Sequence, residues 1–522
     1  MKNVFTFFES AAKDYPQNQA LFVDEVFYTY EILAQKAAFI FGMLPSDSSG
    51  FAGVFAHRSL TAFAGVLGIL KSGKGYIPLN PKFPAQRVAK IIEQSEIQTI
   101  VVEEAFAEKL AEAMKFINRS FNLIFPFAEN VDRKYQAIFH QHRIINHLPG
   151  TEPFQQEQQP VESQYTYMLF TSGSTGKPKG VPVRHENVVA YVENLNSMFD
   201  FTSEDRFSNT FDLTFDLSVH DLFVSWSNGA TLYCIPGKSL MAPARFIKKH
   251  ALTSWFSVPS LANGMSRLRM LKKDAYPSLR YTLFCGEPLP EALALKWQQA
   301  APYSRMVNIY GPTEATIGIT AYEMSRESLK SQNGILSIGK VFPGNTALVM
   351  DEQQREVNKD EPGELWLRGA QVTEGYWKQP EKTAEAFVFL NGIWHYKTGD
   401  LVKKDTDGDL FYLGRKDFQA KIQGYRVETQ EIDFVITDST ELQDVVTLPI
   451  DDGLHNTKLV TCIAGKETGI IEKEKIYDIC KAKLPDYMVP EYILFFESFP
   501  LNQNAKTDRK ALLQWVKVEL GI

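Results

Sequence analysis

Two hydrophobic patterns alternate along most of this chain, one with the spacing of helices and one typical of short buried strands. Residues Leu60–Lys71 have the helical spacing, and Gly75–Leu79 form a short apolar run of the strand type. Residues 181–183 and 186–195 repeat the strand and helix patterns later in the chain. Because alternating strands and helices usually build sheets covered by helices, the pattern predicts an α/β fold with largely parallel sheets.

The length of the chain and two irregular stretches indicate more than one domain. A chain of 522 residues is too long for one hydrophobic core. Residues 149–164 are rich in Gln, Glu and Pro and are expected to form an exposed loop. After a charged stretch near 413–419, strand patterns at 445–448 and 459–464 and a helical pattern at 472–483 follow. We therefore expect a large domain over residues 1–416 and a small α+β domain over residues 417–522.

Composition and charge narrow the class of protein. The hydrophobic fraction of 44% is ordinary for a globular protein, and the net charge of −7 argues against an overall basic surface for nucleic acid. The four cysteines lie far apart without a C-x-x-C pair, so neither a zinc site nor a disulfide framework is expected. No apolar stretch reaches the roughly 20 residues that span a bilayer, and the N-terminus lacks the pattern of a signal peptide. These features predict a soluble cytoplasmic protein without membrane or nucleic-acid partners.

The segment T-S-G-S-T-G-K-P-K-G at residues 171–180 is the strongest local indication of chemistry. It follows a strand-like run at 165–170, and its backbone N–H groups, hydroxyls and lysines could surround phosphate oxygens. The spacing G-x4-G-K-[ST] of a P-loop is not met. A flexible surface linker has a similar composition, so the loop alone leaves both interpretations open.

Read with later segments, this loop resembles the adenylate-forming (ANL) superfamily, which includes acyl-CoA synthetases, luciferases and the adenylation domains of nonribosomal peptide synthetases. The segments follow the family's order and cover essentially the whole chain. They are L-K-S-G at 70–73 and Y-I-P-L at 76–79, the loop itself, F-D-L-S-V at 215–219, N-I-Y-G-P-T-E at 308–314, G-E-L at 363–365 with G-Y at 375–376, Y-K-T-G-D at 396–400, G-R-K-D at 414–417 with G-Y-R-V-E at 424–428, and N-A-K-T-D-R at 504–509.

The resemblance implies a fold, a reaction and two cofactors. The fold is a large adenylate-forming core of parallel and mixed sheets flanked by helices, with a small distorted barrel, followed by a small mobile α+β domain. The reaction joins a carboxylic acid to AMP and then passes the acyl group to a thiol, with ATP and Mg²⁺ as cofactors. Such a ligase needs a cation at the transferring group and a grip on the nucleoside.

The resemblance also assigns roles within the ATP site. Glu314 takes the place of the Mg²⁺-binding glutamate, Tyr310 stacks on adenine, Asn308 bonds the adenine edge, and Asp400 and Arg415 hold the ribose. Taken singly, Tyr310 could be core packing, Asp400 a turn residue and Glu314 a helix-start charge. The implied catalytic residues are Lys506, Glu314 and Thr171; the ATP-binding set is Thr171, Ser172, Gly173, Ser174, Thr175, Gly176, Lys177, Lys179, Asn308, Tyr310, Gly311, Thr313, Asp400, Arg415 and Lys506.

Two further positions are implied to serve a movement of the small domain. Lys506 matches the catalytic lysine that bridges substrate carboxylate and phosphate oxygens, although Ala505 stands beside it where the family usually has glycine. Asp417 matches the hinge about which the small domain rotates between half-reactions. The loop 421–426 then replaces Lys506 at the site and lines the approach of the thiol.

The acid is expected to be an amino acid, because Asp216 takes the place of the aspartate that pairs with the substrate ammonium. A buried carboxylate facing an ammonium discriminates strongly, since either charge left unpaired is penalised. A charge at a helix N-terminus is the other interpretation, and Asp212, four residues earlier, leaves open which aspartate matters. The pocket positions carried over are Asp216, Leu217, His220, Ser257, Leu283, Cys285, Ile309, Ile317 and Gly318, a lining that suits a small or medium, possibly polar, amino acid.

The thiol acceptor is expected to be a separate molecule, because no carrier motif follows Lys506. By resemblance it is the phosphopantetheine arm of a carrier protein, as in a stand-alone amino-acid adenylation domain of secondary-metabolite biosynthesis. Coenzyme A is the second option. An acyl- or aryl-CoA ligase, an amide-forming synthetase and a nucleotide-binding protein without turnover remain open as rival functions.

Overall fold

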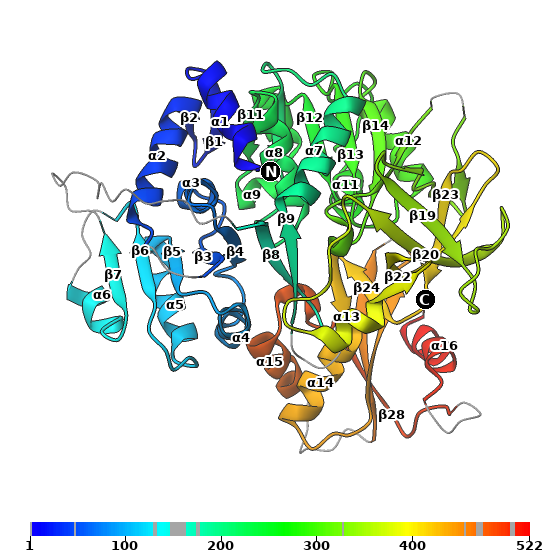
Figure 1. The fold of residues 1–522 in the computed structure, drawn as a ribbon. Coiled ribbons are helices and arrows are strands. Elements are labelled where there is room, and N and C mark those ends of the chain that lie inside the picture. The colour runs from blue at the N-terminus through cyan, green and yellow to red at the C-terminus, as the bar shows by residue number, and fades with distance from the viewer. Residues whose placement is uncertain are drawn as a thin grey trace.

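The computed structural model describes residues 3–45, 49–128, 133–146, 163–173, 178–325, 328–453, 456–465, 473–501 and 507–521. Two large sheets and the helices around them form the greater part of the molecule (Figure 1). The seven-stranded sheet consists, in spatial order, of β7 (Arg143–Asn146), β6 (Asn122–Phe125), β5 (Thr99–Val102), β3 (Phe51–Phe55), β4 (Gly75–Leu79), β8 (Tyr165–Thr171) and β9 (Lys179–Arg184). Its strands are parallel except for the antiparallel pair β8–β9.

The second large sheet has nine strands and is parallel through its middle. In spatial order it consists of β18 (Lys340–Val341), β15 (Thr320–Glu323), β14 (Arg305–Tyr310), β13 (Tyr281–Phe284), β12 (Ser254–Ser257), β10 (Arg206–Asn209), β11 (Thr231–Cys234), β1 (Gln19–Val23) and β2 (Val26–Thr29). Antiparallel pairs occur only at its two ends in the described residues. The α/β fold with largely parallel sheets predicted from the sequence is therefore confirmed.

Helices pack between the two sheets and on their outer faces. They are α1 (Phe5–Asp14), α2 (Tyr30–Met43), α3 (Leu60–Lys71), α4 (Ala85–Ser95), α5 (Ala107–Met114), α6 (Arg133–Ile138), α7 (His185–Met198), α8 (Leu217–Ser227), α9 (Gly237–Leu240), α10 (Ala244–His250), α11 (Pro259–Arg267) and α12 (Glu291–Ala300), with short 3₁₀ turns at Glu104–Phe106 and Thr313–Ala315. The helix α13 (Pro380–Ala386) packs on strands of the last third of the chain, and a third 3₁₀ turn, Asp486–Met488, lies in the C-terminal part. The predicted helix Leu60–Lys71 and strand Gly75–Leu79 have the bounds of α3 and β4, and 181–183 and 186–195 fall within β9 and α7.

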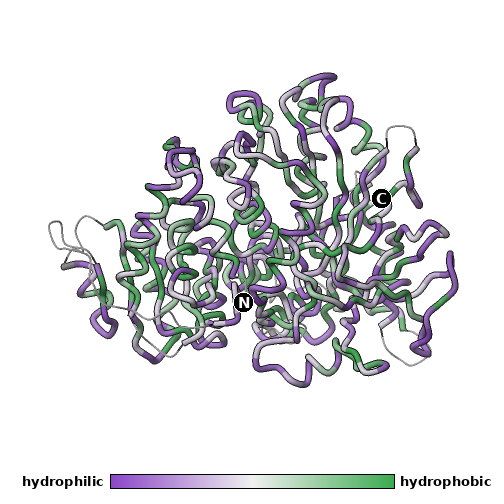
Figure 2. The backbone as a smooth tube through the Cα atoms, turned by 45° about the horizontal axis from the view of Figure 1, so that its top comes forward, coloured by the Kyte–Doolittle hydropathy of each residue, from purple (hydrophilic) through white to green (hydrophobic). Residues whose placement is uncertain are grey.

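One cluster of buried side chains joins the two sheets through the helices. It runs from Val54 of β3 through α2, α3, α7 and α8 to Leu232 of β11. Every residue of β3 and β4 is buried, as expected of parallel strands covered on both faces. Figure 2 shows this arrangement, with hydrophobic stretches concentrated in the interior and hydrophilic residues at the peripheral turns. The packed layers hold the ends of the strands, and the loops that follow them, in fixed positions.

The chain after residue 330 adds smaller sheets, which are antiparallel except for the parallel pair of the last two strands. A five-stranded sheet, where the small barrel was expected, contains β19 (Asn345–Met350), β20 (Pro362–Gly369), β22 (Ile393–Lys404), β21 (Phe387–Leu390) and β23 (Leu410–Arg415); β16 (Ser331–Gln332) and β17 (Ile335–Leu336) pair separately. The smaller C-terminal part has the hairpin β24 (Gln419–Ile422) and β25 (Tyr425–Glu428), the sheet β26 (Val445–Asp451), β27 (Thr457–Ala464) and β28 (Tyr492–Phe496), and helices α14 (Thr429–Ser439), α15 (Lys473–Lys483) and α16 (Arg509–Leu520). The strands and helix predicted after residue 440 coincide with β26, β27 and α15, whereas most of the expected loop 149–164 lies outside the described residues.

The C-terminal part packs directly against the large one (orange and red in Figure 1). A buried ion pair joins Arg87 of α4 to Glu431 of α14 at 2.6 Å. The hydroxyl of Ser172 donates to the carbonyl of Arg426 at 2.8 Å and accepts the N–H of Glu428 at 2.9 Å. These contacts place the hairpin β24–β25 next to the loop after β8.

Candidate active site

A cavity of about 80 Å³ lies between the large part and the β24–β25 hairpin. Its lining combines residues that the sequence assigns to ATP with residues it assigns to the amino acid. From the large part these are Thr171, Ser172, Asp216, Leu217, Cys285, Gly311, Thr313, Asp400 and Arg415, and the C-terminal part contributes Lys421, Gly424, Tyr425, Arg426 and Tyr487 among others. The structure thus brings members of both predicted sets to one cavity.

The residues assigned to the nucleoside are linked by direct contacts. Tyr310 donates its hydroxyl to Asp400, and Arg415 places Nη1 2.6 Å from the other oxygen of Asp400. Lys421 holds its ammonium 5.3 Å from the centre of the Tyr310 ring. Asn308 is buried and donates its side-chain amide to the carbonyl of Ser337 at 2.9 Å. Asp400 is therefore a buried acceptor held by a phenol and a guanidinium, not a turn residue facing solvent.

Only part of the 171–180 loop belongs to the described residues. The hydroxyl oxygen of Thr171 is buried without a hydrogen-bond partner there, and Gly173 donates its N–H to Glu431 at 3.1 Å. Lys179 lies 3.3 Å from Glu428. The predicted positions Ser174, Thr175, Gly176, Lys177 and Lys506, with Ala505, lie outside the described residues.

Glu314 is fully buried and holds a cation from the C-terminal part. Nη1 of Arg426 lies 3.0 and 2.9 Å from its two carboxylate oxygens, and Tyr376 donates its hydroxyl to it at 2.7 Å. Burial would raise the pKa of Glu314, but the charges of Arg426 and Lys179 outweigh it and hold that pKa below the usual value. Glu314 is therefore an ionised carboxylate that accepts a positive charge, as the predicted role requires.

Asp216 lies at the N-terminus of α8, yet its side chain makes no capping hydrogen bond to that helix. It is 4% exposed. Burial raises the pKa of Asp216 to about 7, a hydrogen bond from Thr313 opposes the rise, and the Glu314 charge adds to it. A carboxyl in this environment is stabilised in its ionised form by a cation in the cavity.

The remaining predicted pocket residues are buried but do not line the described cavity. His220 accepts or donates a 2.8 Å hydrogen bond with the hydroxyl of Tyr191, and burial lowers the pKa of His220 to about 3. The ring N–H of Trp255 donates to Ser257 at 2.9 Å. The residues behind the cavity are His220, Ser257, Leu283, Ile309, Ile317 and Gly318.

The space beside Gly318 is already filled by a neighbouring side chain. A Cβ at Gly318 would lie 2.2 Å from Cγ2 of Ile309, so that methyl group already packs on the glycine. Cys285 lines the cavity, and burial raises the pKa of Cys285 to about 12, which leaves a neutral thiol.

Asp417, the predicted hinge, is tied to the preceding strand by its side chain. Its carboxylate lies 2.6 and 2.7 Å from two nitrogens of Arg415 and accepts the N–H of Gln419 at 3.1 Å. The same Arg415 contacts Asp400. The nucleoside site and the start of the C-terminal part therefore share one guanidinium.

Four residues in the site were not assigned contacts from the sequence. Arg426 binds Glu314, Tyr376 donates to Glu314, Glu287 accepts the N–H of Gly424 at 2.8 Å, and Tyr425 donates its hydroxyl to Asp212 at 2.6 Å. Arg426, Tyr425 and Tyr376 belong to motifs that carried the resemblance. The sequence signal was present, but these contacts depend on how the two parts dock.

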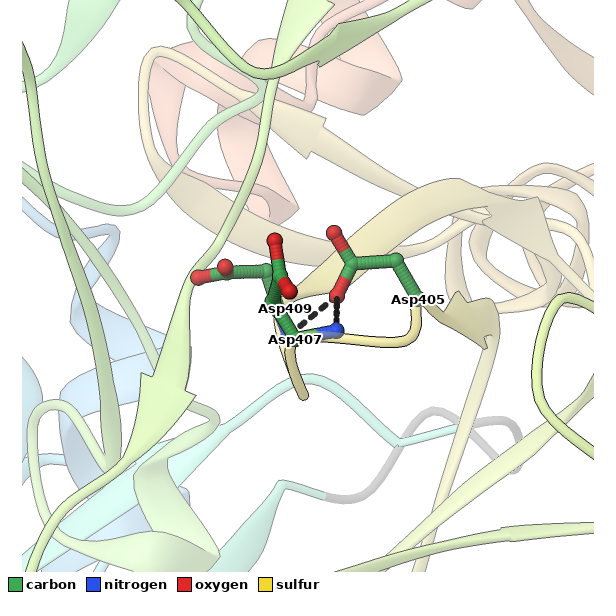
Figure 3. Close-up of side chains that lie close together, drawn as sticks. All are labelled: Asp405, Asp407 and Asp409. Carbon is green, nitrogen blue, oxygen red and sulfur yellow. Dashed lines mark hydrogen bonds between the residues drawn. The ribbon is translucent and has the colours of Figure 1, made fainter.

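An acidic cluster at the turn between β22 and β23 lies apart from this cavity. Asp405, Asp407 and Asp409 converge there (Figure 3). Nζ of Lys330 lies 2.9, 2.7 and 2.6 Å from their respective carboxylates. A lysine ammonium thus balances this cluster.

Comparisons with known proteins identify the family of this chain. The AMP-binding enzyme family matches residues 8–377. This chain belongs to that family. A D-alanine–D-alanyl carrier protein ligase of Lacticaseibacillus rhamnosus is 30% identical over 98% of both chains. One of the plipastatin synthase proteins of Bacillus subtilis is 29% identical over 98% of this chain, which spans 19% of that protein.

A solved structure shares the overall fold and carries a ligand related to the predicted chemistry. It is the Vibrio cholerae adenylation domain AlmE in complex with glycyl-adenosine-5′-phosphate, with a TM-score of 0.89 and 28% identity over 99% of this chain and 98% of that one. Within the described residues, no helix of this chain is both long and apolar enough to cross a membrane.

The environment of Asp216 predicts a pH effect on stability. The unfolded chain releases this proton near its ordinary pKa of 3.8, whereas the folded protein keeps it to about pH 7. Folding is therefore favoured below pH 4 by this group, and the contribution is lost as pH rises to 7. Asp216→Asn removes the effect, so between pH 5 and pH 8 it should gain stability relative to wild type by roughly 3 kcal/mol, because the folded pKa lies about two pH units above the lower end of that window. Urea unfolding of both proteins at the two pH values measures this, and parallel pH profiles would contradict it.

Proposed function

We propose that this chain activates a small amino acid as aminoacyl-AMP, with release of pyrophosphate, and passes it to the phosphopantetheine thiol of a separate carrier protein. The proposal depends on the carboxyl of Asp216, which is buried and makes no capping hydrogen bond to α8. It shares one cavity with Thr171, Asp400 and Arg415, so an ammonium on Asp216 and a nucleotide would lie side by side. Holding an amino acid and ATP next to each other favours attack of the amino-acid carboxylate on the α-phosphate.

Within this proposal the ATP-site residues have distinct tasks. Asp400 accepts hydrogen bonds from the ribose, Tyr310 packs on the adenine, and Thr171 offers its unpartnered hydroxyl to phosphate oxygens. Lys506 supplies the cation that bridges the acid and the phosphate. The small domain, residues 417–522, swings about Asp417 between the two half-reactions.

Magnesium fits the carboxylate of Glu314. In this arrangement the guanidinium of Arg426 contacts both carboxylate oxygens of Glu314. A positive group therefore already binds this buried carboxylate. When bound, Mg²⁺ would neutralise charge on the phosphates, with Glu314 as its protein ligand. Arg426 has to leave Glu314 before another cation can take its place, which requires the β24–β25 hairpin to move.

The contacts among the residues carried over to the amino-acid pocket leave little open space between them and so support a small amino acid. Ile309 packs on Gly318, and the polar groups of His220 and Ser257 contact Tyr191 and Trp255. The names of the relatives, a D-alanine ligase and an adenylation domain bound to glycyl-adenosine-5′-phosphate, point to the same size class. Glycine and both isomers of alanine are therefore the first substrates to test.

A second cavity supports delivery of a long thiol arm. It has a volume of about 500 Å³, lies between α11 and the C-terminal part, and shares Tyr487 with the first cavity. Gly424 separates the two, and a Cβ there would lie 2.5 Å from Cγ1 of Val258. Because Gly424 has no side chain, only its backbone lies between the two cavities, at the place where a thiol would pass.

The charges at this second cavity favour a carrier protein over coenzyme A. Among the described residues that line it, Lys458 is the only cation, and its ammonium lies 2.5 Å from Glu491. The nucleotide phosphates of coenzyme A are usually held by arginines or lysines. A pantetheine arm attached to a protein needs no such cluster.

Asp216 should control both the rate and the choice of acid. Wild type is expected to catalyse pyrophosphate exchange into ATP with glycine or alanine but not with acetate or propionate, which lack the ammonium. Asp216→Ala should lower the amino-acid-dependent rate by about 10²-fold or more, because it leaves the ammonium buried and unpaired. Exchange supported equally by the ammonium-free acids would instead favour an acyl-CoA ligase.

The hinge role of Asp417 predicts an unequal loss. Proline fixes the backbone at this position, so Asp417→Pro should slow thioester formation by about 10²-fold while pyrophosphate exchange falls much less. Asp417→Asn is the matched control, since it keeps a freely rotating backbone. If Asp417→Pro slows thioester formation and pyrophosphate exchange by the same factor, Asp417 is not the hinge.

A further inference from the structure

The first aspartate of the repeated F-D-L-T/F-D-L-S sequence makes a contact that no substrate role explains. Asp212 lies in the bend before α8. One of its carboxylate oxygens accepts the N–H of Thr214 at 2.8 Å and also the Thr214 hydroxyl. The other accepts the hydroxyl of Tyr425 at 2.6 Å, across the junction between the two parts of the molecule. Asp212 therefore holds its own loop with one oxygen and the C-terminal part with the other.

The ring of Tyr425 is inserted between aromatic residues from both sides of the junction. It stacks on Phe215 with 5.1 Å between ring centres and on Tyr487 with 4.0 Å and an interplanar angle of 1°. Phe83 of the large part packs edge-on against Tyr487. Burial and the neighbouring Asp212 raise the pKa of Tyr425 well above its usual value, so the phenol is the donor. Docking of the C-terminal part thus buries this stack and completes one hydrogen bond.

Asp212 and Phe215 belong to the loop that leads directly to Asp216. Movement of the docked hairpin therefore acts on Asp212, which is four residues from Asp216 in the sequence. Two events that share a rigid loop are coupled, and the coupling acts equally in both directions.

We propose that Asp212 and Tyr425 form a latch that holds the hairpin β24–β25 in the docked arrangement and positions it for transfer to the thiol. The latch opens when the small domain leaves for adenylate formation. Both residues act by positioning, because Thr214 and Tyr425 occupy the two carboxylate oxygens of Asp212 and the Tyr425 hydroxyl is used for this contact. The inference rests on the proposed function only for its link to the second half-reaction.

The test compares Tyr425→Phe, which keeps the ring stack, and Asp212→Asn with wild type. We expect single-turnover transfer from preformed aminoacyl-AMP to the holo carrier to slow about tenfold in each variant, the effect of one hydrogen bond to a charged group. Pyrophosphate exchange should slow by a clearly smaller factor than transfer in the same variant, because adenylate formation takes place with the latch open; equal slowing of both steps would contradict the latch. Tyr276→Phe is the control, since it removes a 3.0 Å hydroxyl bond to the carbonyl of Met270 within the large part.

Hydrogen exchange gives a readout that does not depend on activity. The N–H of Gly424 donates to Glu287 only while the hairpin is docked, so peptides covering 419–428 should exchange faster in both variants. The double variant should be no faster than either single one, because the two side chains form one interaction. Unchanged exchange in the variants would overturn the latch even if the enzyme is active. If the wild-type protein catalyses no amino-acid-dependent ATP–pyrophosphate exchange, the proposed function is wrong. The hydrogen-exchange measurement would still test the latch in that case.

Discussion

The contact between Arg426 and Glu314 is the interaction on which the arrangement of this protein depends. Glu314 is fully buried, and a buried carboxylate without a cation would be strongly unfavourable. Arg426 supplies that cation from a segment that lies on the far side of the proposed hinge. The position of the C-terminal part is thus tied to the charge state of the active site. Any other cation that binds Glu314 competes with the docked hairpin.

Other contacts across the junction are arranged around this ion pair. Ser172 bonds the backbone on both sides of Val427, Glu287 holds Gly424, and Arg87 binds Glu431. Ser172 and Glu287, from the loops that follow β8 and β13, therefore hold the hairpin, while Arg87 of α4 holds α14 next to it. In the proposed reaction these same loops hold the nucleotide and the amino acid, so one set of loop ends serves both half-reactions.

The sequence was sufficient for the fold, and it named several of the residues that line the cavity. The helical spacing at Leu60–Lys71 and the apolar run at Gly75–Leu79 gave their bounds correctly, because both elements are buried on nearly all sides and their patterns leave little choice. Asp216, Asp400 and Arg415 were placed in one cavity through the order of motifs. The pairing of Arg426 with Glu314 and of Tyr425 with Asp212 could not be predicted in this way. Both contacts join residues more than 100 positions apart across a junction whose geometry no local pattern encodes.

Competition for Glu314 is the most direct test of this account. Hydrogen exchange of residues 419–428 should be measured in the protein alone, with ATP, with Mg²⁺, and with both together. The account predicts faster exchange only when ATP and Mg²⁺ are both present, since the bound metal displaces Arg426 and releases the hairpin. If saturating ATP and Mg²⁺ together leave hydrogen exchange of residues 419–428 unchanged, Glu314 does not bind Arg426 and Mg²⁺ alternately, and the account is wrong.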